Sequence, residues 1–154
     1  GLPVLMHGTD TESNRIFVPH VLAALDVQPL ATVREIKPGE AAYLPTEVLS
    51  PGLKRLLDVR RMVGLRNSAH SLVKLMNPCD GPAVIVSSYT HQEYAVSMAA
   101  VFELTGATAL LLRGTEGEVV ADARRLPLVL KTLRAARRVL PARAAYWPES
   151  RVST

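Results

Sequence analysis

Apolar residues along the chain form four short runs with the pattern of buried strands. The runs are rich in Val, Ile, Leu and Ala, and the last two are almost continuously apolar, as strands of a parallel sheet covered on both faces are. The predicted strands are Val4–Met6, Ala41–Leu44, Ala83–Ser87 and Thr108–Leu112.

Helical patterns lie between these runs. Pro19 fits the first turn of a helix, where its missing N–H costs nothing. Ser50 and Pro51 have the character of a cap and a first helical residue, and Gly64 has that of a glycine ending the helix. The buried face predicted for this helix consists of Leu53, Leu56, Leu57 and Val63.

Two more helices are predicted further along the chain. Asn67 or Ser68 is suited to cap a short helix that runs to about Met76. Thr90 and Glu93 have the spacing of a capping box, which predicts the start of a longer helix between the third and fourth strands.

The order strand, helix, strand near the third and fourth runs indicates a right-handed βαβ unit. The sequence therefore predicts an α/β domain over residues 1–123, with a mostly parallel sheet flanked by helices. The segment Arg124–Leu140 is basic and has a helical pattern, so residues 124–154 are predicted to form a basic tail that is helical or disordered.

Composition narrows the class of protein. Apolar residues make up 48% of the chain, too many for a disordered protein, and no apolar run reaches the ~20 residues that a membrane-spanning helix needs. Because of this, we expect no membrane partner. The single cysteine excludes an internal disulfide framework, which indicates a reducing, cytoplasmic compartment. Because the chain opens at Gly1 directly in a strand-like run, we expect it to be a piece of a longer protein.

Charge is distributed unevenly along the sequence. Residues 1–123 hold ten Lys/Arg and thirteen Asp/Glu, a net charge of −3. Residues 124–154 hold eight Lys/Arg and one Glu, a net charge of +7. Such a basic cluster indicates an anionic partner, although a solvated helix face or a disordered arm explains it equally well.

The segment Gly64–Pro78, GLRNSAHSLVKLMNP, is the strongest candidate for a functional site. Arg66, His70 and Lys74 are spaced i, i+4, i+8, so a helix beginning at Asn67 would place them on one face, with Arg66 at its N-terminus. Free N–H groups at that end favour anions, and a guanidinium fork suits phosphate or carboxylate. The alternative is an ordinary amphipathic helix with solvated charges.

Two further candidates follow predicted strands, where ligands gather in open α/β sheets. His7-Gly8 either lets a ligand approach the backbone closely or holds a histidine with a local hydrogen bond. Arg113–Glu118 is either a glycine turn that binds an anion or Mg²⁺, or a simple hairpin turn. The chain has no Walker A or GxGxxG motif, no metal-ligand spacing of histidines and no nucleophile elbow.

These three motifs, in this order, resemble the C-terminal α/β domain of anthranilate phosphoribosyltransferase and its relatives, glycosyltransferase family 3. Gly64–Pro78 matches the family's GxRTxFNxxGPLxNP segment without gaps, Met6–Gly8 its histidine-glycine loop, and Gly114–Glu118 its glycine-rich turn. The resemblance spans about residues 1–123. It implies a phosphoribosyltransferase fold of the anthranilate type without the family's N-terminal helical domain, and a homodimer for the full-length protein.

The motifs also depart from those of the family's enzymes. Arg66 stands where the family's arginine helps to hold the aromatic acceptor. The family's Thr, Asn and Gly-Pro are replaced by Asn67, His70 and Val73-Lys74. The lysine before His-Gly is Met6, and the Asp-Glu pair that binds Mg²⁺ is Gly117-Glu118, which leaves Glu118 as half of a metal site. We therefore expect no cofactor in this fragment; Mg²⁺ and phosphoribosyl pyrophosphate belong to the enzyme interpretation alone.

The stretches GLRNSAHSLVKL and LLLRGTEGE resemble more closely a non-tryptophan branch of bacterial family members that bind DNA. This resemblance implies that the ancestral phosphate-binding cleft has become a nucleic-acid groove. Our leading hypothesis is therefore sequence-independent binding of nucleic acid, above all DNA. Residues expected to contact phosphates are Arg66, Asn67, His70 and Lys74, with His7, Gly8, Arg15 and Arg113 nearby. Two alternatives stay open: a pentosyltransferase with an unusual acceptor, and a structural or dimerisation module.

Overall fold

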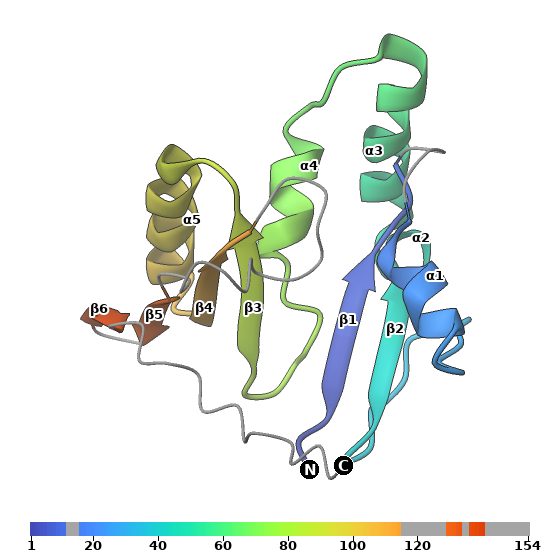
Figure 1. Ribbon diagram of the computed structural model, residues 1–154, viewed down its shortest axis with the longest axis horizontal. Coiled ribbons are helices and arrows are strands. Elements are labelled where there is room, and N and C mark those ends of the chain that lie inside the picture. The colour runs from blue at the N-terminus through green and yellow to red at the C-terminus, as the bar shows by residue number, and fades with distance from the viewer. Residues whose placement is uncertain (12–15, 115–128, 134–135, 141–154) are drawn as a thin grey trace, which may run out of the picture. The chain divides into compact units, whose positions relative to one another are not determined.

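The chain forms two structural units, Gly1–Pro78 and Cys79–Thr154, and each is described by itself. A computed structural model describes residues 1–11, 16–114, 129–133 and 136–140 (Figure 1). Both units combine helices with strands, and each contains one parallel strand pair, so the predicted α/β class is confirmed. The predicted domains, 1–123 and 124–154, stay a prediction.

The first unit is built on two parallel strands, β1 (Val4–Gly8) and β2 (Ala41–Pro45). Both strands were predicted, and each extends slightly beyond its predicted end. The middle of β2, Ala42 to Leu44, is almost completely buried and is the centre of this unit's core. Helix α1 (Val18–Ala23) has Pro19 in its first turn, as predicted, and buries Leu22.

Helix α3 (Pro51–Val63) begins and ends at the predicted residues, directly after the short helix α2 (Thr46–Leu49). The Ser50 hydroxyl accepts a hydrogen bond from the Leu53 amide at 3.4 Å, which caps the first turn. Gly64 has φ +75°, the left-handed conformation that ends many helices.

The predicted buried face of α3 is only half right. Leu57 is fully buried and Leu53 is half-buried, but Leu56 and Val63 are exposed. Apolar periodicity identifies the apolar face of a helix, but it does not tell how much of that face the neighbouring elements cover.

The short helix predicted after Asn67 is present in a tighter form. Helix α4 (Ala69–Leu72) continues directly as one turn of 3₁₀-helix, η1 (Val73–Leu75). Ser68 has the N-cap position of α4 without forming a side-chain cap. Ala69 is the buried residue that fixes this helical segment to the unit.

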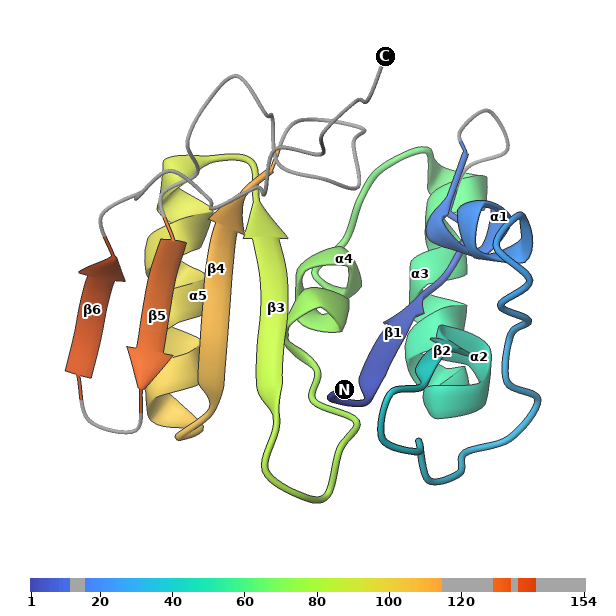
Figure 2. The same cartoon turned by 60° about the horizontal axis from the view of Figure 1, so that its bottom comes forward.

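The second unit contains the predicted strand–helix–strand motif: β3 (Val84–Tyr89), α5 (Gln92–Leu104) and β4 (Thr108–Arg113). β3 and β4 pair in parallel, and α5 lies across one face of the sheet (Figure 2). The core residues of this unit come from all three elements: Tyr89, Ala95, Met98, Ala99, Phe102, Ala109 and Leu111.

The capping box predicted at Thr90 and Glu93 is wrong. The N-cap of α5 is His91, without a side-chain cap. Because the helix begins one residue later than the capping box requires, Glu93 lies at its second position, where its carboxylate instead favours the positive end of the helix dipole.

The helix predicted over Arg124–Leu140 is also wrong in the parts that the structure describes. β5 (Val129–Leu133) and β6 (Ala136–Leu140) are strands, which pair antiparallel to β4 and to each other. The order of this sheet is β3-β4-β5-β6, and only its β3–β4 pair has the predicted parallel direction. Pairing with β4 overrides the local helical pattern, and basic residues are common on strands near a sheet edge.

Within residues 1–11, 16–114 and the two C-terminal strands, no helix has the length and apolar character needed to cross a membrane.

Replacing Gly64 with alanine should lower the free energy of unfolding by about 1 kcal/mol, because a Cβ is strained in the left-handed conformation. Chemical denaturation measures the change. Gly52, inside α3 with open space around it and no positive φ, is the matched control. Gly52→Ala should leave stability unchanged or raise it, and an equal loss in both variants would contradict the role assigned to Gly64.

Candidate functional site

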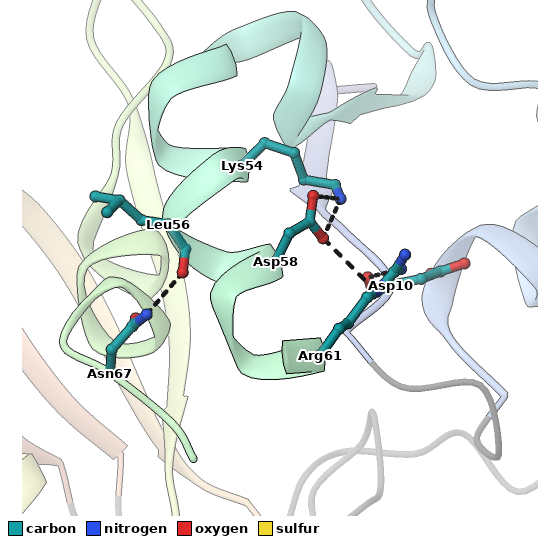
Figure 3. Close-up of polar contacts among 6 residues, drawn as sticks. All are labelled: Asp10, Lys54, Leu56, Asp58, Arg61 and Asn67. Atoms are coloured by element: carbon teal, nitrogen blue, oxygen red, sulfur yellow. Dashed lines mark hydrogen bonds and ion pairs between the residues drawn. The ribbon is translucent and has the colours of Figure 1, made fainter. Parts of the chain in front are cut away.

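Asn67 connects the two helical segments of the candidate site. Its side-chain amide donates a hydrogen bond from Nδ2 to the backbone carbonyl of Leu56 on α3, at 2.6 Å (Figure 3). Its Oδ1 accepts a hydrogen bond from the backbone amide of Ala69 at 3.0 Å, which caps α4. Asn67 therefore fixes the turn between the helices, a structural task that a phosphate contact would compete with.

His70 lies against Asn67. Its Nδ1 atom is 3.2 Å from Asn67 Oδ1 and 3.3 Å from the Asn67 backbone carbonyl oxygen. The ring is half-buried. The structure thus brings together these two predicted phosphate-binding residues and uses them to support one another.

Arg66 and Lys74 are the exposed cations of this segment. Arg66 lies in the extended stretch before α4, and Lys74 lies in η1. Burial of the ammonium lowers the pKa of Lys74, and the positive charge of Arg66 lowers it further. The second effect shows that the two charges lie close enough to repel one another, although no helix joins them as the spacing argument supposed.

A chain of polar contacts holds the C-terminal half of α3 to the end of β1. Lys54 Nζ donates to both carboxylate oxygens of Asp58 at 2.6 Å, and Arg61 Nε lies 3.7 Å from the same carboxylate. Arg61 Nη2 donates to the backbone carbonyl of Asp10 at 3.1 Å (Figure 3). Each exposed contact stabilises little alone, but together they orient the end of the helix.

His7 is the penultimate residue of β1 and is half-buried. Burial lowers its pKa, and a hydrogen bond to the backbone carbonyl of Met76 partly offsets this. Met76 belongs to the segment Gly64–Pro78, so this contact joins that segment to the His7-Gly8 motif within the first unit. The Nδ1 atom of His7 is buried and has no hydrogen-bond partner among the described residues.

Sequence reasoning missed several polar groups near His7, at the carboxyl ends of β1 and β2. Tyr43 is buried, its hydroxyl oxygen lies near Gly8, and burial, with smaller effects of Asp10 and Glu47, raises its pKa. Thr46 Oγ1 and Asp10 Oδ1 are buried without a hydrogen-bond partner within the described part of the chain. For Asp10 and Thr46, the only signal in the sequence was their position after predicted strands.

The remaining predicted residues are Arg113, Gly8, Arg15 and Glu118. Arg113 is exposed at the end of β4, in the second unit. Gly8 needs no special space, because a Cβ there would lie 3.7 Å from the Tyr43 hydroxyl oxygen, an ordinary contact. Arg15 and Glu118 lie outside the described residues, as do Thr115 to Gly117 of the glycine turn.

Gly114 is the one residue of the predicted glycine turn whose surroundings are described. A Cβ at this position would lie 3.2 Å from the Cβ of Ser88, tighter than ordinary packing. Its amide donates a hydrogen bond to the Tyr89 carbonyl at 2.9 Å. Across residues 1–11 and 16–114, no group of three or more His, Cys, Asp or Glu side chains is arranged to hold a metal ion.

Sequence comparisons define the class of protein. Anthranilate phosphoribosyltransferase of Nocardia farcinica is 31% identical over 121 residues, which is 76% of this chain and 35% of the enzyme. The enzyme of Saccharopolyspora erythraea is 29% identical over 121 residues, 76% of this chain and 34% of the enzyme. No protein-family model matches the chain. The chain is a homologue of the anthranilate phosphoribosyltransferases, glycosyltransferase family 3.

A longer match is found with YbiB of Escherichia coli (strain K12), named as an uncharacterised protein. It is 33% identical over 145 residues, which cover 91% of this chain and 45% of YbiB. This match extends past residue 123 into the basic C-terminal stretch that begins at residue 124, which is therefore part of the homologous sequence. The chain spans less than half the length of the curated relatives it matches.

Asn67→Ala should lower the free energy of unfolding by about 1–2 kcal/mol, because it removes two hydrogen bonds that join α3 to α4. Urea denaturation followed by circular dichroism gives the value. Ser68→Ala, at an exposed neighbour that forms no cap, should change stability by less than about 0.5 kcal/mol. Equal effects of the two substitutions would show that the Asn67 contacts do not stabilise the unit.

The lowered pKa of His7 predicts a loss of stability in acid. Because the folded pKa lies below the unfolded value of 6.5, the unfolded state binds more protons as the pH falls through that value, which favours unfolding. His7→Asn should therefore flatten the decline in unfolding free energy between about pH 7 and about pH 5. Parallel profiles for the variant and the wild type would contradict the shift.

Proposed function

We propose that the protein binds nucleic acid, above all DNA, without sequence preference, and that α3, η1 and Arg66 in the turn between the helices supply its phosphate contacts. The observation that supports this most is the charge of one continuous stretch, residues 51–77, called here the basic segment. It contains six Lys/Arg and a single acid: Lys54, Arg55, Arg60, Arg61, Arg66, Lys74 and Asp58.

The charge of the basic segment contrasts with that of the rest of its unit. Residues 1–50 contain three Lys/Arg and six Asp/Glu, so a net charge of −3 precedes a net charge of +5. Positive charge gathered in one stretch of sequence, most of it on α3, produces a local field that attracts a polyanion. A merely solvated surface would more often mix the two signs.

Arg66 and Lys74 sharpen this argument. Both side chains are exposed, and the charge of one lowers the pKa of the other. A phosphate bound beside both cations would be attracted by both charges. Asn67 and His70, which support each other and the turn, have in this proposal a positioning role rather than a phosphate contact of their own.

The sequence comparisons support a function that differs from that of the enzymes. The match with YbiB covers 91% of the chain, whereas the anthranilate phosphoribosyltransferases cover 74–79%. The replacement of Gly-Pro by Val73-Lys74 adds a cation at the segment where the enzymes hold their acceptor. We also propose a cytoplasmic location, a homodimer and an additional N-terminal helical domain for the whole protein, as the family resemblance implies.

Binding to a DNA oligonucleotide should weaken with salt, with log K falling by about 0.7–0.9 per log unit of salt for each phosphate contact. Arg66→Ala combined with Lys74→Ala should reduce the slope by about 1.5 and the affinity by about tenfold, equally for unrelated sequences. Fluorescence anisotropy titrations at several salt concentrations measure both quantities.

The control for this experiment removes the same formal charge from the acidic part of the same unit. Arg34→Ala combined with Lys37→Ala eliminates two exposed cations outside the basic segment. This double variant should keep the wild-type salt slope. Affinity that does not depend on salt, or equal losses for both double variants, would rule out the basic segment as the binding surface.

A phosphoribosyltransferase with an unusual acceptor is the second candidate. The buried polar groups of His7, Asp10 and Thr46 at the carboxyl ends of β1 and β2 favour it, because unpaired buried donors and acceptors suit a small polar ligand. Mg²⁺ and phosphoribosyl pyrophosphate would then be required. Titration calorimetry of the whole protein with both compounds decides the matter, since absence of heat would exclude this function.

A further inference from the structure

An exposed apolar tip projects from the basic segment where α3 ends. Met62 is 85% exposed, Val63 is 60% exposed and Leu65 is 70% exposed. These three side chains, called here the apolar tip, surround the left-handed Gly64. Single exposed apolar residues are common on protein surfaces, but three large ones within four positions indicate a contact surface.

The apolar tip is held in place from both sides. On the side of α3, Arg61 donates to the Asp10 carbonyl and lies beside Asp58. On the other side, Asn67 donates to the Leu56 carbonyl (Figure 3). Because residues 61 and 67 are both anchored, the five residues between them are presented in a fixed turn. A partner therefore binds the tip without a large cost in conformational entropy.

The charges around the apolar tip indicate its partner. The stretch Arg60–Arg66 reads RRMVGLR, so arginines precede and follow the three apolar residues. Nucleic acid fits this arrangement, because it combines apolar base faces with a regular array of phosphates. Proteins that deform nucleic acid use this combination, with Leu, Ile or Met against bases and Arg on the adjoining backbone.

We propose that the apolar tip contacts the bases of single-stranded nucleic acid whose phosphates the basic segment binds. This inference rests on the proposed function and adds the part of the ligand that the tip recognises. Single strands expose base faces without the cost of unstacking a duplex, so an aliphatic tip gains most from them. Contact with base faces is sequence-tolerant, which agrees with binding that does not select a sequence.

The test compares a base-bearing oligonucleotide with an abasic one of the same length and charge. The wild-type protein should prefer the base-bearing strand, and Met62→Ser combined with Leu65→Ser should weaken its binding by about tenfold while leaving the abasic strand unaffected. The matched control is Leu104→Ser, at a leucine 88% exposed at the end of α5 in the second unit, which should change neither affinity.

A second measurement reports the contact directly. In a Trp147→Phe background, Leu65→Trp places the sole indole at the tip and Leu104→Trp places it at the control position. The base-bearing strand should quench the emission at position 65 and not at 104, and the abasic strand should quench neither. Binding of both strands with equal affinity and without quenching at position 65 would overturn the inference while leaving phosphate binding intact.

The competing occupants give different results. If the apolar tip contacts another protein segment or a second copy of the chain, the serine variant changes the oligomeric state in light scattering and leaves the preference for bases unchanged, which would also overturn the inference. If neither strand binds in a salt-dependent manner, the proposed function itself fails.

Discussion

The two hydrogen bonds of Asn67 are the interaction on which the candidate site depends. One joins the side chain to the Leu56 carbonyl on α3, and the other caps α4 through the Ala69 amide. Together they set the position of α4 relative to α3, the helix that carries Lys54, Arg55, Arg60 and Arg61. The orientation of Arg66, which immediately precedes Asn67, and the approach of Lys74 follow from the same turn. A polar residue that was predicted to touch the ligand therefore determines where the charged residues lie.

Like charges define the chemistry of this surface. A small-molecule transferase neutralises a phosphorylated substrate in a closed cleft with a metal ion, whereas a polyanion-binding surface distributes cations over exposed helices. Arg66 and Lys74 are exposed, as the cations of a polyanion-binding surface are. His7 Nδ1 and Thr46 Oγ1, at the end of the strand pair, are buried without a hydrogen-bond partner among the described residues. The first unit therefore combines unpaired buried polar atoms at its strand ends with exposed cations between and after its helices.

Features set by local geometry were predictable from the sequence. The Ser50 cap, the end of α3 at Gly64 and the strands β1 to β4 depend on neighbouring residues and on apolar pattern. Features set by distant contacts were not. The exposure of Leu56 and Val63, the burial of the Thr46 hydroxyl and the pairing of β5 with β4 depend on what packs against each element. The candidate site itself stays a prediction; within it, the supporting role of Asn67 was only partly predictable, since its contact with Leu56 crosses between two helices.

The contacts that anchor the turn after α3 differ greatly in sequence separation. The contact between residues closer in sequence is therefore expected to form earlier in folding. Asn67 and Leu56 are 11 residues apart, whereas Arg61 and Asp10 are 51 apart. Loop-closure entropy makes the longer closure costlier by about 1.4 kcal/mol. The helical hairpin can therefore form early in folding, as a local element, before the end of β1 is attached to it. Opening of the β1 end would leave the hairpin assembled, so the surface that carries the arginines is a kinetically separate part of its unit.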